Sequence, residues 1–301
     1  MNLYTQSESN IRKTWLYLFF FLALIIAVGW AMSYYFESYV ILYVAVAVSV
    51  LMNFFAYWSS DKIVLAMNRA REIKKQDNPE LYRIVENLSI TAGLPVPKVY
   101  IIDSAQPNAF ATGRNAEHAV LAVTTGLLQK LDKAELEGVI AHELSHIGNK
   151  DILLQTIIVV LVGFIVILTD FFFRVSFWGG GRRSNDREGG QIGAIIMVAA
   201  LALAVLSPVF AQLIKLAISR KREFLADSSG AMLTRHPEGL ARALEKIAAD
   251  PNELRGANDA MAHLYIADPF KGKQKKSWLH GLFMTHPPVE QRVAVLRGME
   301  I

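Results

Sequence analysis

The chain has 301 residues, of which 53% are hydrophobic and 19% are charged, and its formal net charge is +4. The mean hydropathy of +0.29 exceeds that of an ordinary soluble domain, so we expect a membrane part joined to a soluble part. The absence of cysteine excludes a disulfide scaffold and agrees with a soluble part in the cytosol.

Two uncharged runs near the N-terminus predict a membrane hairpin. Trp15 to Phe36 and Tyr39 to Trp58 are each long enough to cross a hydrocarbon core of about 30 Å. Only Glu37 and Ser38 separate them. Aromatic residues cluster near the ends as interfacial anchors, namely Trp15, Trp30, Tyr34, Tyr35, Tyr39, Tyr57 and Trp58. A cleaved signal peptide is disfavoured because the first run is long, lacks a small-residue cleavage site and is followed at once by a second span.

Two later apolar runs, Ile152 to Phe173 and Ile192 to Ile214, bring the expected number of spans to four. The chain then divides into an N-terminal hairpin (1–58), a first soluble part (59–151), a second hairpin (152–214) with an exposed loop (174–190), and a second soluble part (215–301).

Basic residues predict the orientation of these spans. The larger group belongs on the cytoplasmic side and consists of Arg12, Lys13, Lys62, Arg69, Arg71, Lys74, Lys75, Lys150, Lys215, Arg220, Lys221 and Arg222. Four arginines fall on the other side: Arg174, Arg182, Arg183 and Arg187. These flanking residues account for the basic pI, and we expect them to be attracted to the anionic headgroups of the lipid bilayer. No nucleic-acid motif accompanies them, so nucleic acid is not expected as a partner.

The first soluble part carries clear local signals. A helix should start at Pro79, capped by Asn78, and stop at Gly93. The segments Val99–Ile102 and Ala119–Val123 are rich in β-branched or apolar residues and bounded by turn formers, so both predict strands.

Four further helices follow from capping and apolar periodicity. One begins after Asp132, where Glu135 completes a capping box. The others are expected over Ile218–Arg235, Pro237–Ala249 and Pro288–Arg297.

The helix after Asp132 contains the sequence His142-Glu143-Leu144-Ser145-His146. Histidines four apart share one helical face, so both imidazoles can bind one metal ion while Glu143 points at a water beside it. The alternative is a helix with polar residues on its solvent face. Because Ile152 follows closely, we expect the helix to run directly into the third span, with the site near the membrane surface.

A catalytic zinc usually takes three protein ligands, so a third is needed. Glu223 is the best candidate, and Asp227, one turn later on the same face, could accept the free ring N–H of a ligand histidine. The two intervening spans return the chain to the side that it left. The competing candidates are the remaining histidines, His118, His236, His263, His280 and His286.

These motifs, together with Asn108-Ala109-Phe110-Ala111-Thr112-Gly113 and His286-Pro287-Pro288, resemble the HtpX group of membrane-integrated zinc metalloproteases, relatives of the CAAX prenyl protease. The resemblance implies a mainly α membrane protein, with four transmembrane helices and a zincin-type α+β metalloprotease domain containing a small β-sheet. It also implies one zinc ion per chain, a multi-pass location in the bacterial cytoplasmic (inner) membrane with the catalytic part facing the cytoplasm, and a role in quality control.

The expected reaction is hydrolysis of a peptide bond by metal-activated water, with Glu143 as the base that takes the proton. In the related enzymes a histidine and an arginine near the positions of His286 and Arg292 hold substrate or stabilise the oxyanion. The alternative makes them a capping histidine and a surface arginine, and His280 competes with His286.

Asn108, Ala109 and Phe110 are expected in a substrate-facing loop, although Asn108 could simply be a turn residue after Pro107. The strand Ala119–Val123 could offer an open edge to an extended substrate. Membrane-protein or unfolded polypeptide substrates are the expected partners, with other membrane proteases as further candidates.

Two other functions compete: a narrow processing protease acting on lipid-attached chain ends, and a membrane metal-binding sensor without turnover. A pure binding site needs no general base, so Glu143 argues against the sensor. Proteolysis inside the bilayer is disfavoured by the polar residues at both ends of the helix, Asp132, Lys133, Glu135, Glu137, Asn149, Lys150 and Asp151.

Overall fold

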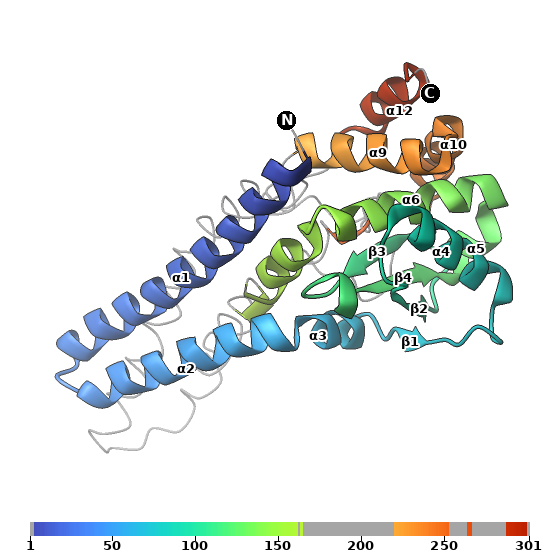
Figure 1. Cartoon of the computed structure of the whole chain (residues 1–301). Coiled ribbons are helices and arrows are strands. Elements are labelled where there is room, and N and C mark those ends of the chain that lie inside the picture. Colours follow the sequence, from blue (N-terminus) through green and yellow to red (C-terminus); the bar gives the residue numbers. More distant parts are fainter. Residues whose placement is uncertain (1–2, 162, 165–219, 253–263, 267–286, 300–301) are drawn as a thin grey trace.

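The structure, a computed structural model, describes residues 3–161, 163–164, 220–252, 264–266 and 287–299 (Figure 1). The expected span Ile192–Ile214, the loop 174–190 and residues 162 and 165–173 of the expected span Ile152–Phe173 lie outside the described residues, so the count of four spans stays a prediction.

The N-terminal hairpin is confirmed as two helices long and apolar enough to cross a membrane. Helix α1 (Leu3–Tyr35) and helix α2 (Tyr39–Trp58) lie side by side and project away from the rest of the molecule (Figure 1). Glu37 adopts a φ of 50° in the turn between them. Large apolar side chains on this pair are exposed, as expected for a surface that contacts lipid.

The soluble part contains a mixed sheet of four strands in the order β1-β2-β4-β3. The strands are β1 (Arg71–Glu72), β2 (Lys98–Ile102), β3 (Ala109–Thr112) and β4 (Val120–Thr124). Strands β2 and β4 are parallel, and the other two pairs are antiparallel.

Two sequence predictions are wrong here. The expected edge strand, β4, lies inside the sheet between β2 and β3, and the segment expected as a loop forms the edge strand β3. The pattern failed because all four residues of β3 are buried, so polar and apolar residues do not alternate, and alanine is a poor strand former.

The caps predicted at Asn78, Gly93 and Asp132 are all present, and three short helices that were not predicted accompany them. Helix α3 (Ser60–Met67) follows the hairpin, and α4 (Pro79–Ala92) starts where the Asn78 side chain accepts from Leu81 N and ends at a left-handed Gly93. A one-turn 3₁₀ helix (Ala116–His118) precedes β4, and α5 (Thr125–Lys130) follows it. Helix α6 (Lys133–Gly148) begins with the Asp132–Glu135 capping box.

Helix α6 does not run directly into the third span, contrary to the expectation from sequence. It ends at Gly148, and the next helix, Asp151–Leu161, is bent from it by 85°. Lys150 has a left-handed φ of 56°, a backbone conformation that interrupts a right-handed helix. The bend directs the second helix back along the hairpin (Figure 1).

Helix α6 is the centre of the soluble part and packs against α4, β3, α9 (Arg220–Thr234) and α10 (Pro237–Ala249). Helix α12 (Val289–Arg297) covers α9 and α10. Gly230 allows the close approach of α9, because a Cβ added there would lie 2.9 Å from His142 N. The packing of α9 on α6 therefore places residues from two distant segments beside the histidines.

Candidate metal centre

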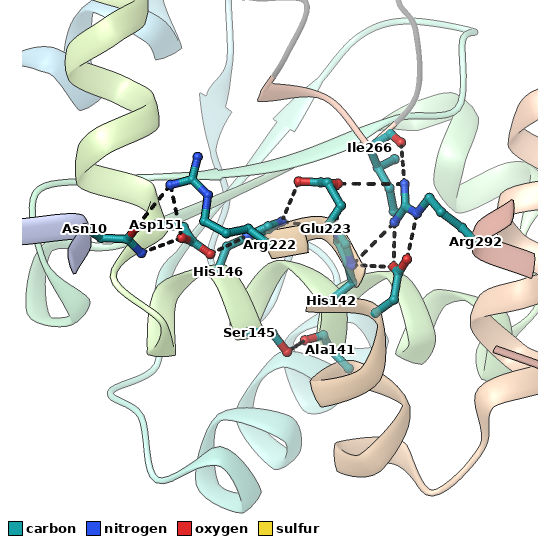
Figure 2. Close-up of polar contacts among 11 residues, drawn as sticks. Asn10, Ala141, His142, Ser145, His146, Asp151, Arg222, Glu223, Ile266 and Arg292 are labelled. Carbon is teal, nitrogen blue, oxygen red and sulfur yellow. Dashed lines mark hydrogen bonds and ion pairs between the residues drawn. The ribbon is translucent and has the colours of Figure 1, made fainter. Parts of the chain in front are cut away.

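Three side chains from α6 and α9 point toward one another (Figure 2). His142 Nε2 lies 3.2 Å from His146 Nε2 and 3.9 Å from Glu223 Oε2. His146 Nε2 lies 3.7 Å from Glu223 Oε1. All three side chains are buried. Among the described residues they are the one group of three or more metal-ligating side chains able to hold an ion, as the sequence predicted for this trio.

The other nitrogen of each imidazole contacts a carboxylate. His142 Nδ1 lies 2.9 Å from Asp227 Oδ1, and His146 Nδ1 lies 3.0 Å from Asp151 Oδ2. A carboxylate is an acceptor, so each Nδ1–H donates to it, which leaves both Nε2 lone pairs facing the centre. The two Nε2 atoms are 3.2 Å apart, so a cation is needed between them: a proton on His146 in the metal-free protein, or a bound metal ion in its place.

The donor set fits zinc. Atoms bound about 2.1 Å from a tetrahedral ion lie about 3.4 Å from one another, close to the three observed separations. Two imidazole nitrogens and one carboxylate form one of the recurring ligand sets of catalytic zinc. Carboxylates that fix the ligand tautomers, as Asp227 and Asp151 do here, commonly accompany such sites.

Arg292 is buried with 1% of its surface exposed, so the alternative of a surface arginine is wrong. Its Nε and Nη2 donate to the two Asp227 oxygens at 2.8 and 2.6 Å, and its Nη1 lies 3.9 Å from Glu223 Oε2. Burial raises the pKa of Asp227, but the Arg292 charge and hydrogen bonds outweigh burial and lower that pKa to about 2. Asp227 therefore stays ionised opposite His142.

The residues that surround His146 were not predicted from the sequence. Asp151 is fully buried and accepts from Asn10 Nδ2 at 2.7 Å through the oxygen that does not face His146 (Figure 2). Arg222 Nη1 lies 3.5 Å from the same oxygen and donates to Asn10 Oδ1 at 3.2 Å. The first membrane helix thus contacts the metal centre through Asn10, and the only sequence signal was a charged residue directly before an apolar run.

Glu143 is 2% exposed and lies close enough to His142, His146 and Glu223 for their charges to shift its pKa. Burial raises its pKa, while the two histidines and a hydrogen bond from the Ala111 amide act in the opposite direction. A carboxyl with a raised pKa beside a metal centre is suited to accept and return a proton.

The hydrogen bond from Ala111 places Glu143 at the outer edge of β3. Because Thr124 N donates to Asn108 O, the antiparallel ladder directs the backbone groups of Ala109 and Ala111 away from β4. At this outer edge, Ile266 N donates to Ala109 O at 3.2 Å. Arg292 Nη1 in turn donates to Ile266 O at 3.3 Å.

The three expected substrate-facing residues occupy different places. Asn108 is buried before β3, where its side-chain Oδ1 accepts from Ala109 N and its backbone N–H donates to Thr124 Oγ1. Ala109 is on the outer edge, whereas the buried Phe110 ring packs edge-on against Tyr265, 5.5 Å away between centroids.

A scan against protein families matches this chain to the model described as peptidase family M48, over residues 75–300. The chain belongs to peptidase family M48. Among its relatives is a protease HtpX homolog from Dictyoglomus thermophilum, 46% identical, with 98% of this chain and 94% of the relative covered. Another, from Pyrococcus furiosus, is 49% identical, with 84% and 85% covered. The resemblance stated from the motifs is therefore confirmed.

Among solved structures, the crystal structure of Ste24p from S. mikatae matches with a TM-score of 0.49 and 19% identity. The match covers 97% of this chain and 66% of the other, so this M48 chain spans slightly less than two thirds of that protein.

The remaining histidines of the M48 chain do not compete for the metal where they are described. His118 is exposed and bonds Asn115 Oδ1 through Nδ1, and His236 is exposed before α10. His263, His280 and His286 lie outside the described residues, so the role of His286 stays a prediction.

Proposed function

We propose that this chain is a zinc-dependent endopeptidase of the bacterial inner membrane, with its catalytic part on the cytoplasmic side. The observation that carries the proposal is the convergence of His142 Nε2, His146 Nε2 and the Glu223 carboxylate beside the buried Glu143. Membership in family M48 and the names of the relatives support a membrane metalloprotease.

His142, His146 and Glu223 would hold the ion. Bound zinc would supply polarisation of the scissile carbonyl and a lowered pKa of the attacking water. Glu143 accepts the proton of that water and returns it to the leaving amine. Burial raises the pKa of Glu143 above its ordinary value, and a more basic carboxylate is a better acceptor for that proton.

The substrate is proposed to add as an extended strand along the outer edge of β3. This edge passes the general base, since Ala111 N–H donates to Glu143. Main-chain pairing makes few demands on side chains and suits an enzyme that cuts many sequences. Because Ile266 N already bonds Ala109 O, a substrate strand must take over that carbonyl or bind closer to Gly113.

Arg292 is proposed to act mainly through Asp227. Its two-pronged contact with that carboxylate holds Asp227 against His142 and so fixes the ring that binds the metal. His286 remains the candidate for stabilising the oxyanion, as the resemblance implies.

Removal of damaged or misfolded membrane proteins is the proposed physiological role, since the site is carried beside a membrane hairpin. The alternative is a processing protease that trims lipid-attached chain ends. Substrate range separates the two: degradation of several unfolded and membrane proteins supports quality control, and cleavage restricted to one fixed terminus supports processing.

The proposal is tested with Glu143→Gln, which removes the base but keeps all metal ligands. We expect wild-type zinc content and loss of proteolysis by about 10²- to 10⁴-fold. Glu137→Gln is the matched control, because Glu137 is on the same helix and pairs only with Lys133, at 3.9 Å, among the described residues. A Glu143→Gln enzyme that cleaves at the wild-type rate would remove Glu143 from this role.

A further inference from the structure

A pocket of about 340 Å³ lies where the membrane hairpin meets the soluble part, separate from the metal centre. Thr14 and Trp15 of α1 and Tyr57 of α2 form one wall. The other wall comes from the soluble part and from the bend between α6 and the next helix, including Leu94, Arg114 and Lys150. A volume of this size can hold a small ligand, or one part of a larger ligand.

The pocket combines apolar walls with two positive charges. Arg114 and Lys150 are its charged lining residues, and none of the described residues lining it is acidic. The Arg114 guanidinium lies 5.0 Å from the centre of the Trp58 ring, and its Nη2 contacts His118 Nε2 at 2.5 Å. Among the described residues it forms no ion pair with a carboxylate, so its charge is available to a ligand. Lys150 is exposed at the left-handed corner between the two helices. The charges therefore favour an anionic ligand.

The surroundings place the pocket at the level of a bilayer interface. The rings of Trp15 and Tyr57 stack with centroids 5.9 Å apart at the end of the hairpin nearest the soluble part. Tryptophan and tyrosine in such belts lie at the headgroup level. On the soluble side, Ile90 and Val96 flank the turn that carries Leu94 and are 73% and 46% exposed, which suits contact with lipid rather than water.

We propose that this pocket binds one anionic phospholipid, with the phosphate facing Arg114 and Lys150 and the first part of an acyl chain against the apolar walls. Charge selects an anion, and the apolar lining beside the hairpin selects a lipid over a free phosphate ester. The site contains no metal ligand or general base of the proposed protease, so it stands independently of the proposed function.

The test uses the purified full chain in detergent with phosphatidylglycerol or phosphatidylcholine, and counts bound lipid by native mass spectrometry. We expect one phosphatidylglycerol bound in preference to phosphatidylcholine. Each cation near an anionic lipid contributes about a factor of five in affinity, so Arg114→Gln with Lys150→Gln should weaken phosphatidylglycerol binding about thirtyfold.

The matched control is Arg83→Gln with Lys98→Gln, which removes two exposed cations outside the pocket and should leave the lipid preference unchanged. A second variant, Ala116→Leu, keeps both pocket cations but fills part of the space, and should also lower binding. Excess glycerol phosphate should not displace the lipid.

Three results would overturn the proposal: equal binding of the two lipids by the wild type, undiminished phosphatidylglycerol binding in the folded Arg114/Lys150 variant, or displacement by glycerol phosphate. The last result would assign the pocket to a free phosphate ester.

Discussion

Asp151→Asn should weaken zinc binding although Asp151 does not belong to the proposed ligand set. Asp151 accepts the Nδ1–H of His146 at 3.0 Å, and so orients the ring whose Nε2 faces the metal position. Loss of such a partner typically lowers metal affinity 10- to 100-fold, or by about 1.4 to 2.7 kcal/mol. We expect an effect in this range, because the amide keeps the shape but not the charge.

The same substitution also leaves a buried arginine without its carboxylate partner. Arg222 is 2% exposed, and Asp151 is its carboxylate partner among the described residues, at 3.5 Å. Breaking a buried pair on one side typically costs about 3 to 5 kcal/mol. The metal-free variant should therefore unfold at a lower temperature than the metal-free wild type.

Competition titration with a zinc chelator measures affinity, and thermal unfolding of the chelator-treated protein measures stability. Asp250→Asn is the control, because Asp250 is buried and ion-paired with Lys130 but contacts none of the described histidines. This control should lose stability and keep wild-type zinc affinity. If Asp151→Asn binds zinc within about twofold of the wild type, well below the usual effect of such partners, the role given to Asp151 is wrong.

Two further predictions concern the packing and the protonation of the site. Gly230→Ala places a Cβ 2.9 Å from His142 N, so α9 must shift, and we expect a loss of about 1 to 3 kcal/mol in unfolding free energy together with weaker zinc binding. Gly148→Ala, whose added Cβ meets nothing closer than 3.8 Å, should change neither quantity. Burial lowers the pKa of His146 in the metal-free protein, but Asp151 helps to raise it to about 9, above the ordinary value near 6.5. The bound proton therefore stabilises the metal-free fold below about pH 6.5, and this contribution is lost as the pH rises through about 9. Metal-free unfolding temperatures should fall over this range, and fall less in Asp151→Asn; identical profiles for the two proteins would contradict the assignment.

Local signals in the sequence predicted much of the helical structure. The cap at Asn78, the capping box at Asp132 and the bounds of α2 and α10 each depend on a few neighbouring residues, and all are found. The sequence also predicted the trio of His142, His146 and Glu223, which lie together in the structure. Two histidines four apart share a helical face, whereas the choice of Glu223 depended on an expected return of the chain through two spans that stay a prediction.

The features that sequence reasoning missed depend on distant contacts. Asn10 and Asp151 are 141 positions apart, and no periodicity connects them. Strand β3 exists because β4 on one side and α6 next to it bury a short, alanine-rich segment. The bend after α6 depends on the left-handed backbone of Lys150, a conformation that cannot be predicted from the presence of a lysine.

Metal analysis of the purified chain and two variants tests the central claim most directly. Wild type and Glu143→Gln should each retain one zinc ion per chain after dialysis against a weak chelator, whereas Glu223→Ala, which removes a proposed ligand, should retain little. Full zinc content in a folded Glu223→Ala protein would contradict the assigned metal centre.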